Sequence, residues 1–170
     1  MRLEFRHLFP CTAEELWSIL DDSAYQAEAT RAAGVRKELL ESRKEGATRV
    51  ERVRVHVNRE LPAPMARALD TDRLSYVQEQ RWRDEDHSMK WTVVPDVGAR
   101  YVQCRGDFRV SNRGKGECER VITGELTVAV PLVGGRMEKK TAEDLQASYD
   151  ATARLLLRFI QQRKNASARS

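Results

Sequence analysis

The order of two hydrophobic patterns along the chain restricts its fold more than any other feature. Between residues 35 and 130, apolar side chains recur at every second position within successive short segments, which is the period of β-strands. After the sequence PLVGG, residues 131–135, the period becomes that of a helix reaching about Arg163. Many strands followed by one long helix predict an antiparallel sheet with a helix packed on one face.

The length and composition are those of one globular domain. A chain of 170 residues buries roughly two thirds of its unfolded surface in a single core. Charged residues make up 33% of the sequence, and 30 basic against 26 acidic side chains leave a net charge of +4 that is spread along the chain. We expect one domain over residues 1–163 and a polar, disordered tail over residues 164–170.

A strand and two short helices are predicted at the N-terminus. Alternation over residues 2–9 indicates the strand. Thr12 and Glu15 have the spacing of a capping box, so a helix is expected to start directly after Thr12. A second helix is expected over residues 23–33, and Gly34 stands where glycine commonly ends a helix.

Six strands are predicted to follow, separated by breaks at residues 45–46, 61–72, 84–86, 95–98 and 112–116. Within residues 52–57, RVRVHV, valines alternate with basic side chains. This is the pattern of a strand with one buried face. The sheet should therefore be antiparallel and covered on one side only.

The pairing of one hairpin follows from the same alternation. If Trp82 lies opposite Met89, then Gln80 lies opposite Trp91, and the apolar side chains of both strands gather on one face. A slip by one residue would mix the faces, which favours this register.

The last hairpin is predicted to close with a three-residue turn at residues 113–115. That turn places Phe108 opposite Arg120 and Gly106 opposite Ile122. Gly106 and Gly124 fall within otherwise strong strands, so we expect the sheet to bend at both positions.

Three segments and the order of elements are similar to those of a known superfamily. The segments are FPCTAEELW (residues 9–17), LSYVQEQRW (74–82) and CERVITGELTVAVPLVGGRMEK (118–139). With them the chain resembles an uncharacterised bacterial branch of the START-like (SRPBCC, helix-grip) superfamily. That superfamily includes lipid-transfer domains, pollen allergens, plant hormone receptors and polyketide cyclases.

The resemblance implies an α+β helix-grip fold. In that fold a curved six- to seven-stranded antiparallel sheet wraps around a long C-terminal helix, in the order β-α-α-β-β-β-β-β-β-α. It also implies a cavity between the sheet and the helix that holds hydrophobic molecules.

Geometry independently predicts such a cavity. One helix, about 10 Å across, does not fill the concave side of a bent sheet of six or seven strands. The remaining space is either open or filled by large side chains. The candidate lining residues of this cavity are Val55, Val57, Met65, Tyr76, Gln78, Gln80, Trp91, Val93, Phe108, Arg120, Ile122, Leu145 and Tyr149.

Several of these positions are polar. Tyr76, Gln78 and Gln80 require hydrogen-bond partners if they are buried. The partners are one another, water, or the polar end of a ligand, and the two glutamines are alternatively hydrated near a hairpin end. We expect the guanidinium of Arg120 to stack on the ring of Phe108 rather than to bind a carboxylate.

Residues 61–71, LPAPMARALDT, interrupt the series of strands. Leu61, Met65 and Leu69 recur at a spacing of four, and Pro64 suits the first turn of a short helix. The apolar face of this helix is either a movable lid over one mouth of the cavity or an ordinary connection at the sheet edge.

No motif for catalysis, phosphate binding or zinc binding occurs in the sequence. His7, His56 and His87 are far apart, and alternation directs His56 outward. We therefore predict no catalytic residue, no metal and no cofactor. The basic residues form no stripe, so no nucleic-acid partner is expected, and protein partners stay unidentified. A charged N-terminus without a long apolar run predicts a cytoplasmic protein with no integral membrane segment.

The predicted function is the binding of a hydrophobic small molecule, lipid-like or polyketide-like, by a carrier or sensor. One alternative is an enzyme of the polyketide cyclase or dehydratase type, in which Tyr76, Tyr149 or Arg120 orients an enolising substrate. Another is a protein-binding module with a filled core. The cavity distinguishes them, because an apolar void favours the first, a void with a directed tyrosine the second, and a filled core the third.

Overall fold

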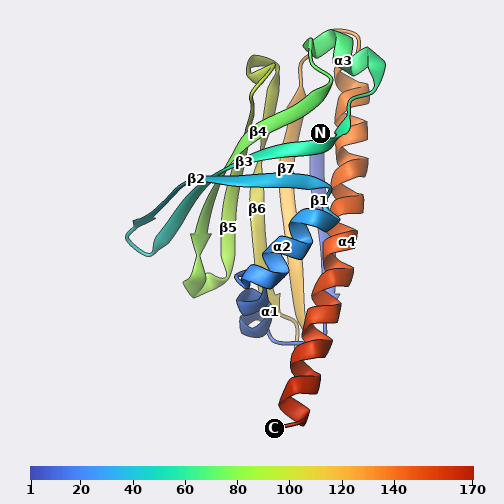
Figure 1. Cartoon of the computed structure of the whole chain (residues 1–170). Coiled ribbons are helices and arrows are strands. Elements are labelled where there is room, and N and C mark those ends of the chain that lie inside the picture. Colours follow the sequence, from blue (N-terminus) through green and yellow to red (C-terminus); the bar gives the residue numbers. More distant parts are fainter.

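A seven-stranded antiparallel sheet curves around a long C-terminal helix (Figure 1). The computed structural model describes all residues from Met1 to Ser170. Its elements are β1 (Arg2–Phe9), α1 (Ala13–Leu20), α2 (Ser23–Ala32), β2 (Val35–Glu45), β3 (Thr48–Glu60), α3 (Ala63–Leu69), β4 (Arg73–Arg83), β5 (Ser88–Pro95), β6 (Val102–Asn112), β7 (Cys118–Val128) and α4 (Gly134–Ala168). The strand order is β1-β7-β6-β5-β4-β3-β2, so β1 and β2 are the edges.

This is the predicted helix-grip architecture, with one difference in its helices. The break between β3 and β4 contains the predicted short helix, α3. The last helix extends beyond Arg163 and ends at Ala168. Residues 164–168, expected in a disordered tail, continue the helix because no glycine or proline stands there to end it. They are exposed on all sides.

The predicted signals at the N-terminal helices are confirmed. The amide of Glu15 donates to Thr12 Oγ1 at 3.2 Å and the amide of Thr12 donates to the Glu15 carboxylate at 2.7 Å, which completes the capping box. Asp22 caps α2 by accepting from amides of the first turn, and these hydrogen bonds lower the pKa of its carboxyl. Gly34 follows α2 with a φ of 66°, which glycine adopts without strain.

The register of β4 and β5 is the predicted one, with Trp82 opposite Met89 and Gln80 opposite Trp91. The register of β6 and β7 was wrong by two residues. Gly106 lies opposite Gly124 rather than Ile122, and the loop spans residues 113–117. A slip by two leaves every side chain on its predicted face.

The indole of Trp91 explains the observed register. Its ring carbons would lie 2.5 Å from a Cβ at Gly106 and 3.1 Å from a Cβ at Gly124. Only glycine leaves room for the ring at these positions, and pairing the two glycines places both against the same indole. Packing across strands therefore selects this register over one with a tighter turn.

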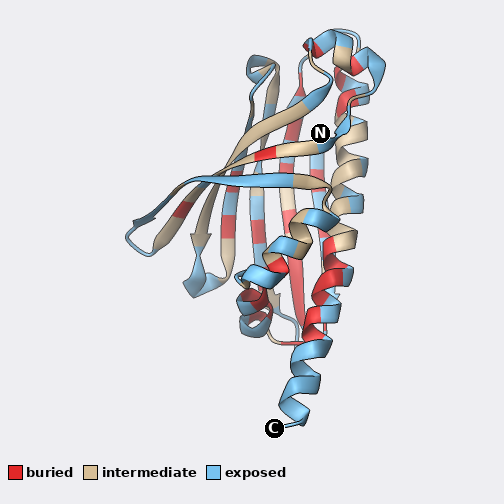
Figure 2. Ribbon diagram, viewed as in Figure 1, coloured by how far each residue is buried: buried red, intermediate tan, exposed pale blue.

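The core is concentrated on one side of the sheet (Figure 2). Every inward-facing residue of β7 is buried, whereas β2 and β4 contain no buried residue. We call β1, β7 and β6, together with α1 and residues 152–160 of α4, the filled half. We call β2, β3 and β4 the open half.

Candidate binding trough

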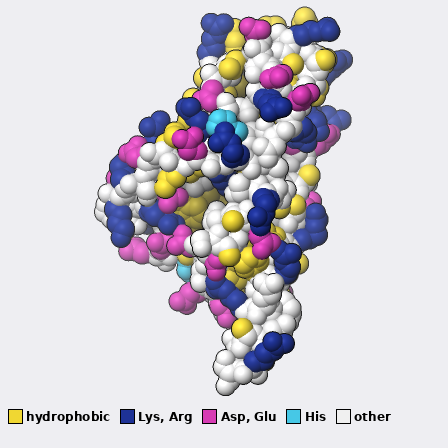
Figure 3. Space-filling view, in the orientation of Figure 1, with side chains coloured by type: hydrophobic (Ala, Val, Ile, Leu, Met, Phe, Trp, Pro, Cys, Tyr) yellow, Lys and Arg dark blue, Asp and Glu magenta, His cyan; other side chains and the backbone are white.

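A hollow opens beneath β2, between the β2–β3 hairpin and helices α1 and α2, and apolar side chains lie in its depth (Figure 3). Strand pairing identifies the side chains that face it, because directly opposite residues of antiparallel strands share a face. Two rows of the open half that face inward are Lys37–Val55–Tyr76 and Leu39–Val53–Gln78. We call the space over these rows, between the sheet and α4, the trough.

The trough exists because α4 packs to one side of the sheet. The main contacts of α4 are with β7, β1, α1 and α2. Leu39 lies opposite Val53 on the concave face and yet is 60% exposed. Leucine is among the most often buried residues, so this exposure shows that the neighbouring space is open.

Three ionisable groups from three elements meet along the trough: Tyr76 of β4, Cys104 of β6 and Tyr149 of α4. Each is only partly buried. Desolvation nevertheless raises the pKa of the Cys104 thiol to about 11 and that of the Tyr149 phenol to about 12, and it raises the pKa of Tyr76 further still. All three groups are neutral near neutral pH, so the two phenols act as hydrogen-bond donors and not as bases.

Lys37 brings a positive charge to the same space. It lies opposite Val55, which is 1% exposed, and it makes no ion pair or side-chain hydrogen bond within the protein. Its side chain remains accessible to solvent, and yet desolvation by the surrounding protein lowers the pKa of the ammonium group. A group that is both accessible and surrounded by protein lies inside an open hollow.

Sequence reasoning missed Lys37, although a signal was present. Lys37 has the same parity as Val35 and Leu39, which also face inward. A bulge between Leu39 and Glu41 reverses the phase of β2 toward the hairpin, so counting back from the turn assigns Lys37 to the wrong face.

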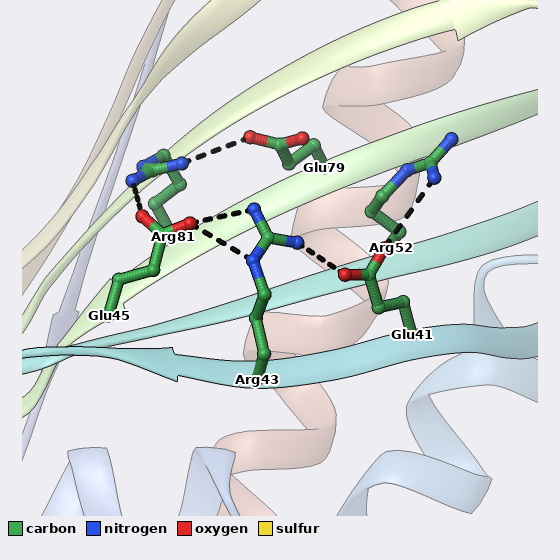
Figure 4. A network of polar contacts seen from close by, with 6 residues as sticks. All are labelled: Glu41, Arg43, Glu45, Arg52, Glu79 and Arg81. Atoms are coloured by element: carbon green, nitrogen blue, oxygen red, sulfur yellow. Dashed lines mark hydrogen bonds and ion pairs between the residues drawn. The ribbon is translucent and has the colours of Figure 1, made fainter.

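The outer face of the open half carries paired charges (Figure 4). Arg43 binds Glu41 and Glu45, each at 2.7 Å, and Arg81 also binds Glu45. Val50 faces outward beneath Arg43 and Arg81 and is fully buried. The outer face is therefore closed by neutralised side chains, in contrast to the trough.

The predicted lining residues fall into two groups. Those buried in or beside the core are Val55, Met65, Trp91, Phe108, Arg120 and Ile122. Those that stay partly accessible on the trough side are Val57, Tyr76, Gln78, Gln80, Val93, Leu145 and Tyr149.

Three polar groups of this set differ in their hydrogen bonding. Gln80 accepts a hydrogen bond from the Trp82 indole at 3.2 Å. Gln78 has no such partner within the protein and keeps contact with solvent. The indole N–H of Trp91 is buried and has no hydrogen-bond partner. Burying an unpaired donor is unfavourable, so the packing of the ring has to compensate for it.

Arg120 does not stack on Phe108, contrary to prediction. Because the register is shifted by two, its guanidinium instead lies over the rings of Phe9 and Tyr149, at 5.5 and 5.7 Å. It donates to the carbonyl of Tyr149 at 2.9 Å and to Nδ1 of His7 at 3.1 Å. Burial lowers its pKa. Arg120 thus joins α4 to β1 and β7 in the filled half.

The contact between Arg120 and His7 continues to a carboxylate. Arginine only donates, so His7 Nδ1 is the acceptor and Nε2 carries the proton that it donates to Asp150 at 2.9 Å. This hydrogen bond lowers the pKa of Asp150. Positions so far apart in sequence give no local pattern, which is why sequence reasoning missed this chain of contacts.

The predicted short helix between β3 and β4 is present as α3. Met65 and Leu69 are 8% and 6% exposed and belong to the main core cluster. α3 lies at the end of the molecule away from α1, beside the start of α4 (Figure 1). It therefore closes one end of the space between sheet and helix, and its mobility as a lid stays a prediction.

No group of three or more His, Cys, Asp or Glu side chains is arranged to hold a metal ion. None of the helices combines the length and apolar character needed to cross a membrane.

The curved sheet and the long helix that packs on its concave face have the helix-grip fold, which solved START-type structures share. The chain belongs to the protein family of unknown function DUF2505, which matches residues 4–160. None of the curated proteins compared with it matches its sequence.

Solved structures with the same fold are distant in sequence. The Zhui aromatase/cyclase from Streptomyces sp. R1128 is similar with a TM-score of 0.67 and 15% identity, over 94% of this chain and 95% of that one. A START superfamily protein from Mycobacterium smegmatis has a TM-score of 0.62 and 12% identity, over 93% and 98%. Norcoclaurine synthase from Thalictrum flavum has a TM-score of 0.60 and 15% identity, over 92% and 86%.

Proposed function

We propose that the protein binds a hydrophobic small molecule, lipid-like or polyketide-like, in the trough and acts as its carrier or sensor. The observation that carries this proposal is the inner face of the open half, whose side chains face a space that α4 does not fill. Ligand pockets combine apolar walls with a few polar groups that orient the ligand. Val53 and Val93 supply such walls, and Tyr76, Gln78 and Tyr149 supply the polar groups.

The similar structures add support at the level of architecture. An aromatase/cyclase and a synthase share this fold, so the fold serves proteins that act on small molecules. The trough is the feature of this chain to which such a role would belong.

Two adjacent valines provide a matched test. Val93 lies in the row that faces the trough, and Val94 lies on the outer face and is 55% exposed. Val93→Trp fills the trough, whereas Val94→Trp adds the same volume outside it. We expect the fluorescent, uncharged probe phenylnaphthylamine to bind the unmodified protein and Val94→Trp alike, and to bind Val93→Trp at least about tenfold more weakly.

Circular dichroism and urea denaturation of both variants check that the fold is intact. Equal binding to both variants would place the probe elsewhere, and failure of the unmodified protein to bind it would show that the trough is closed. Native mass spectrometry of the purified protein, before and after organic extraction, then identifies any molecule that it retains.

A specific observation favours a cyclase- or dehydratase-type enzyme as the second candidate. The phenols of Tyr76 and Tyr149 face the same space and stay protonated, so both can donate to the oxygen of an enolising substrate. Arg120 is occupied by His7 and by the Tyr149 carbonyl, which leaves it no part in this role. A module with a filled core, the third possibility, fits the filled half only.

A further inference from the structure

We infer that the ligand of the trough is amphipathic and carries an anionic end group, a carboxylate, phosphate or sulfonate, which lies over Val55 between Lys37 and Tyr76. This inference rests on the proposed function, because it assigns a chemical class to the molecule in the same trough. It adds a recognition site that apolar burial alone does not require.

These residues lie in one row across three strands of the sheet. Lys37, Val55 and Tyr76 stand opposite one another on β2, β3 and β4. Two strand spacings, about 10 Å, separate the backbones of the outer two. The long side chains on either side cover a short valine that is 1% exposed, so an anion held between their polar ends would lie above an apolar floor.

The charge of Lys37 has no partner within the protein. Glu41 and Arg43, on the outward face of β2 toward the hairpin, take part in ion pairs. Lys37 takes part in none, although desolvation of its ammonium group makes the unpaired charge unfavourable. A ligand anion at this position would supply the missing counter-charge.

Two other charged groups on the inner face, Glu51 and Arg49, lie toward the β2–β3 hairpin. Glu51, 21% exposed, lies 3.7 Å from Arg49, and Arg49 also binds Asp21. Glu51 stands four residues from Val55 along β3, about 13 Å at the usual rise of a strand. Glu51 therefore has a basic partner near the hairpin, whereas Lys37, farther from the hairpin along β2, has no acidic partner.

Hydrogen-bond donors complete the site. The Tyr76 hydroxyl makes no hydrogen bond within the protein and is held in its neutral form, so it is available to donate to an anion. The Gln78 side-chain amide lies on the same face two residues along β4. One cation and two donors around an apolar floor match a head group with several acceptor oxygens.

Two fluorescent probes that differ in one group test this inference. Anilinonaphthalene sulfonate and phenylnaphthylamine share their ring system, and only the former carries an anion. We expect Lys37→Met to weaken binding of the sulfonate at least about tenfold, the usual loss for a hydrogen bond to a charged group, and to change binding of the uncharged probe less than about twofold.

Arg36→Met is the matched control, since Arg36 is the adjacent basic residue of β2 and faces outward opposite His56. It should change binding of neither probe by more than about twofold. Tyr76→Phe should weaken binding of the sulfonate by a smaller factor than Lys37→Met and should leave the uncharged probe unaffected.

The outcomes separate the two proposals. If neither probe binds the unmodified protein, the trough is closed and both proposals fail. If the uncharged probe binds but Lys37→Met affects both probes equally, or neither, then anion recognition is refuted and the proposed function stands. Equal losses of sulfonate binding in Lys37→Met and Arg36→Met would show a general effect of surface charge and would also refute the inference.

Discussion

β7 and β4 are strands of 11 residues each in the same sheet, yet every inward residue of β7 is buried and no residue of β4 is. The difference arises from the layer above them. α4 packs on β7 and β1, whereas the open half has no comparable cover. The polarity of the inward residues matches this difference in cover. β7 has the apolar residues Ile122 and Leu126 on its inner face, whereas β4 has Gln78 and Gln80. On this strongly curved sheet, the burial of a strand therefore depends on which element packs over it as well as on its alternation of apolar and polar side chains.

The largest expected effect comes from the side chain that joins the two halves. Trp91 on the central strand β5 packs against the glycines of β6 and β7 and is 7% exposed. Trp91→Ala should lower the free energy of unfolding by about 3–5 kcal/mol, as the loss of a large buried aromatic side chain does. Urea denaturation measures the change. A loss below about 0.5 kcal/mol, typical of surface positions, would show that Trp91 lies outside the core.

Two residues of one row, one in each half of the sheet, should differ in their contribution to stability. Val53 of β3 and Leu126 of β7 lie in the same row across the sheet, in the open and the filled half. Leu126 is 2% exposed, so Leu126→Ala should cost about 2–5 kcal/mol. Val53 is only partly buried, and Val53→Ala should cost about 1 kcal/mol or less. Equal losses in urea denaturation would show that the trough is as tightly packed as the core.

The smallest effect is chemical and leaves the fold unchanged. Cys104 is partly accessible in the trough, whereas Cys11 and Cys118 are 4% and 0% exposed. We expect iodoacetamide to modify Cys104 before the other two, as located by mass spectrometry of peptides. A first adduct on Cys11 or Cys118 would contradict the placement of Cys104 in the trough.

The pH dependence of this reaction follows from the raised pKa. Burial favours the neutral thiol and raises the pKa of Cys104 to about 11. The thiolate is the reactive form. The rate of Cys104 modification in the folded protein should therefore rise about tenfold per pH unit up to about pH 10, whereas the rate of an unfolded thiol has levelled off by that pH. The neutral thiol stabilises the fold at lower pH, and this contribution is lost as the pH rises through about 11. Phenylnaphthylamine in the trough should slow the reaction.

Much of the fold could be predicted because its signals are local. The capping box at Thr12 and Glu15 and the register of β4 and β5 depend on residues close together in the chain. The register of β6 and β7 depends on the Trp91 ring, which comes from a different hairpin, and was wrong for that reason. The candidate site was predicted in part, since alternation placed Tyr76 and Gln78 on the inner face, whereas the bulge in β2 hid Lys37.

The succession of strands and helices and the buried face of most strands follow from the sequence, because periodicity and caps act within a few residues. Which of the inward faces are covered follows from long-range packing. The course of α4 along β7 and β1, the packing of Trp91 against paired glycines and the unpaired charge of Lys37 all depend on residues far apart in the chain. The element that covers each strand is determined by many long-range contacts together, so it cannot be predicted from any one segment of the sequence.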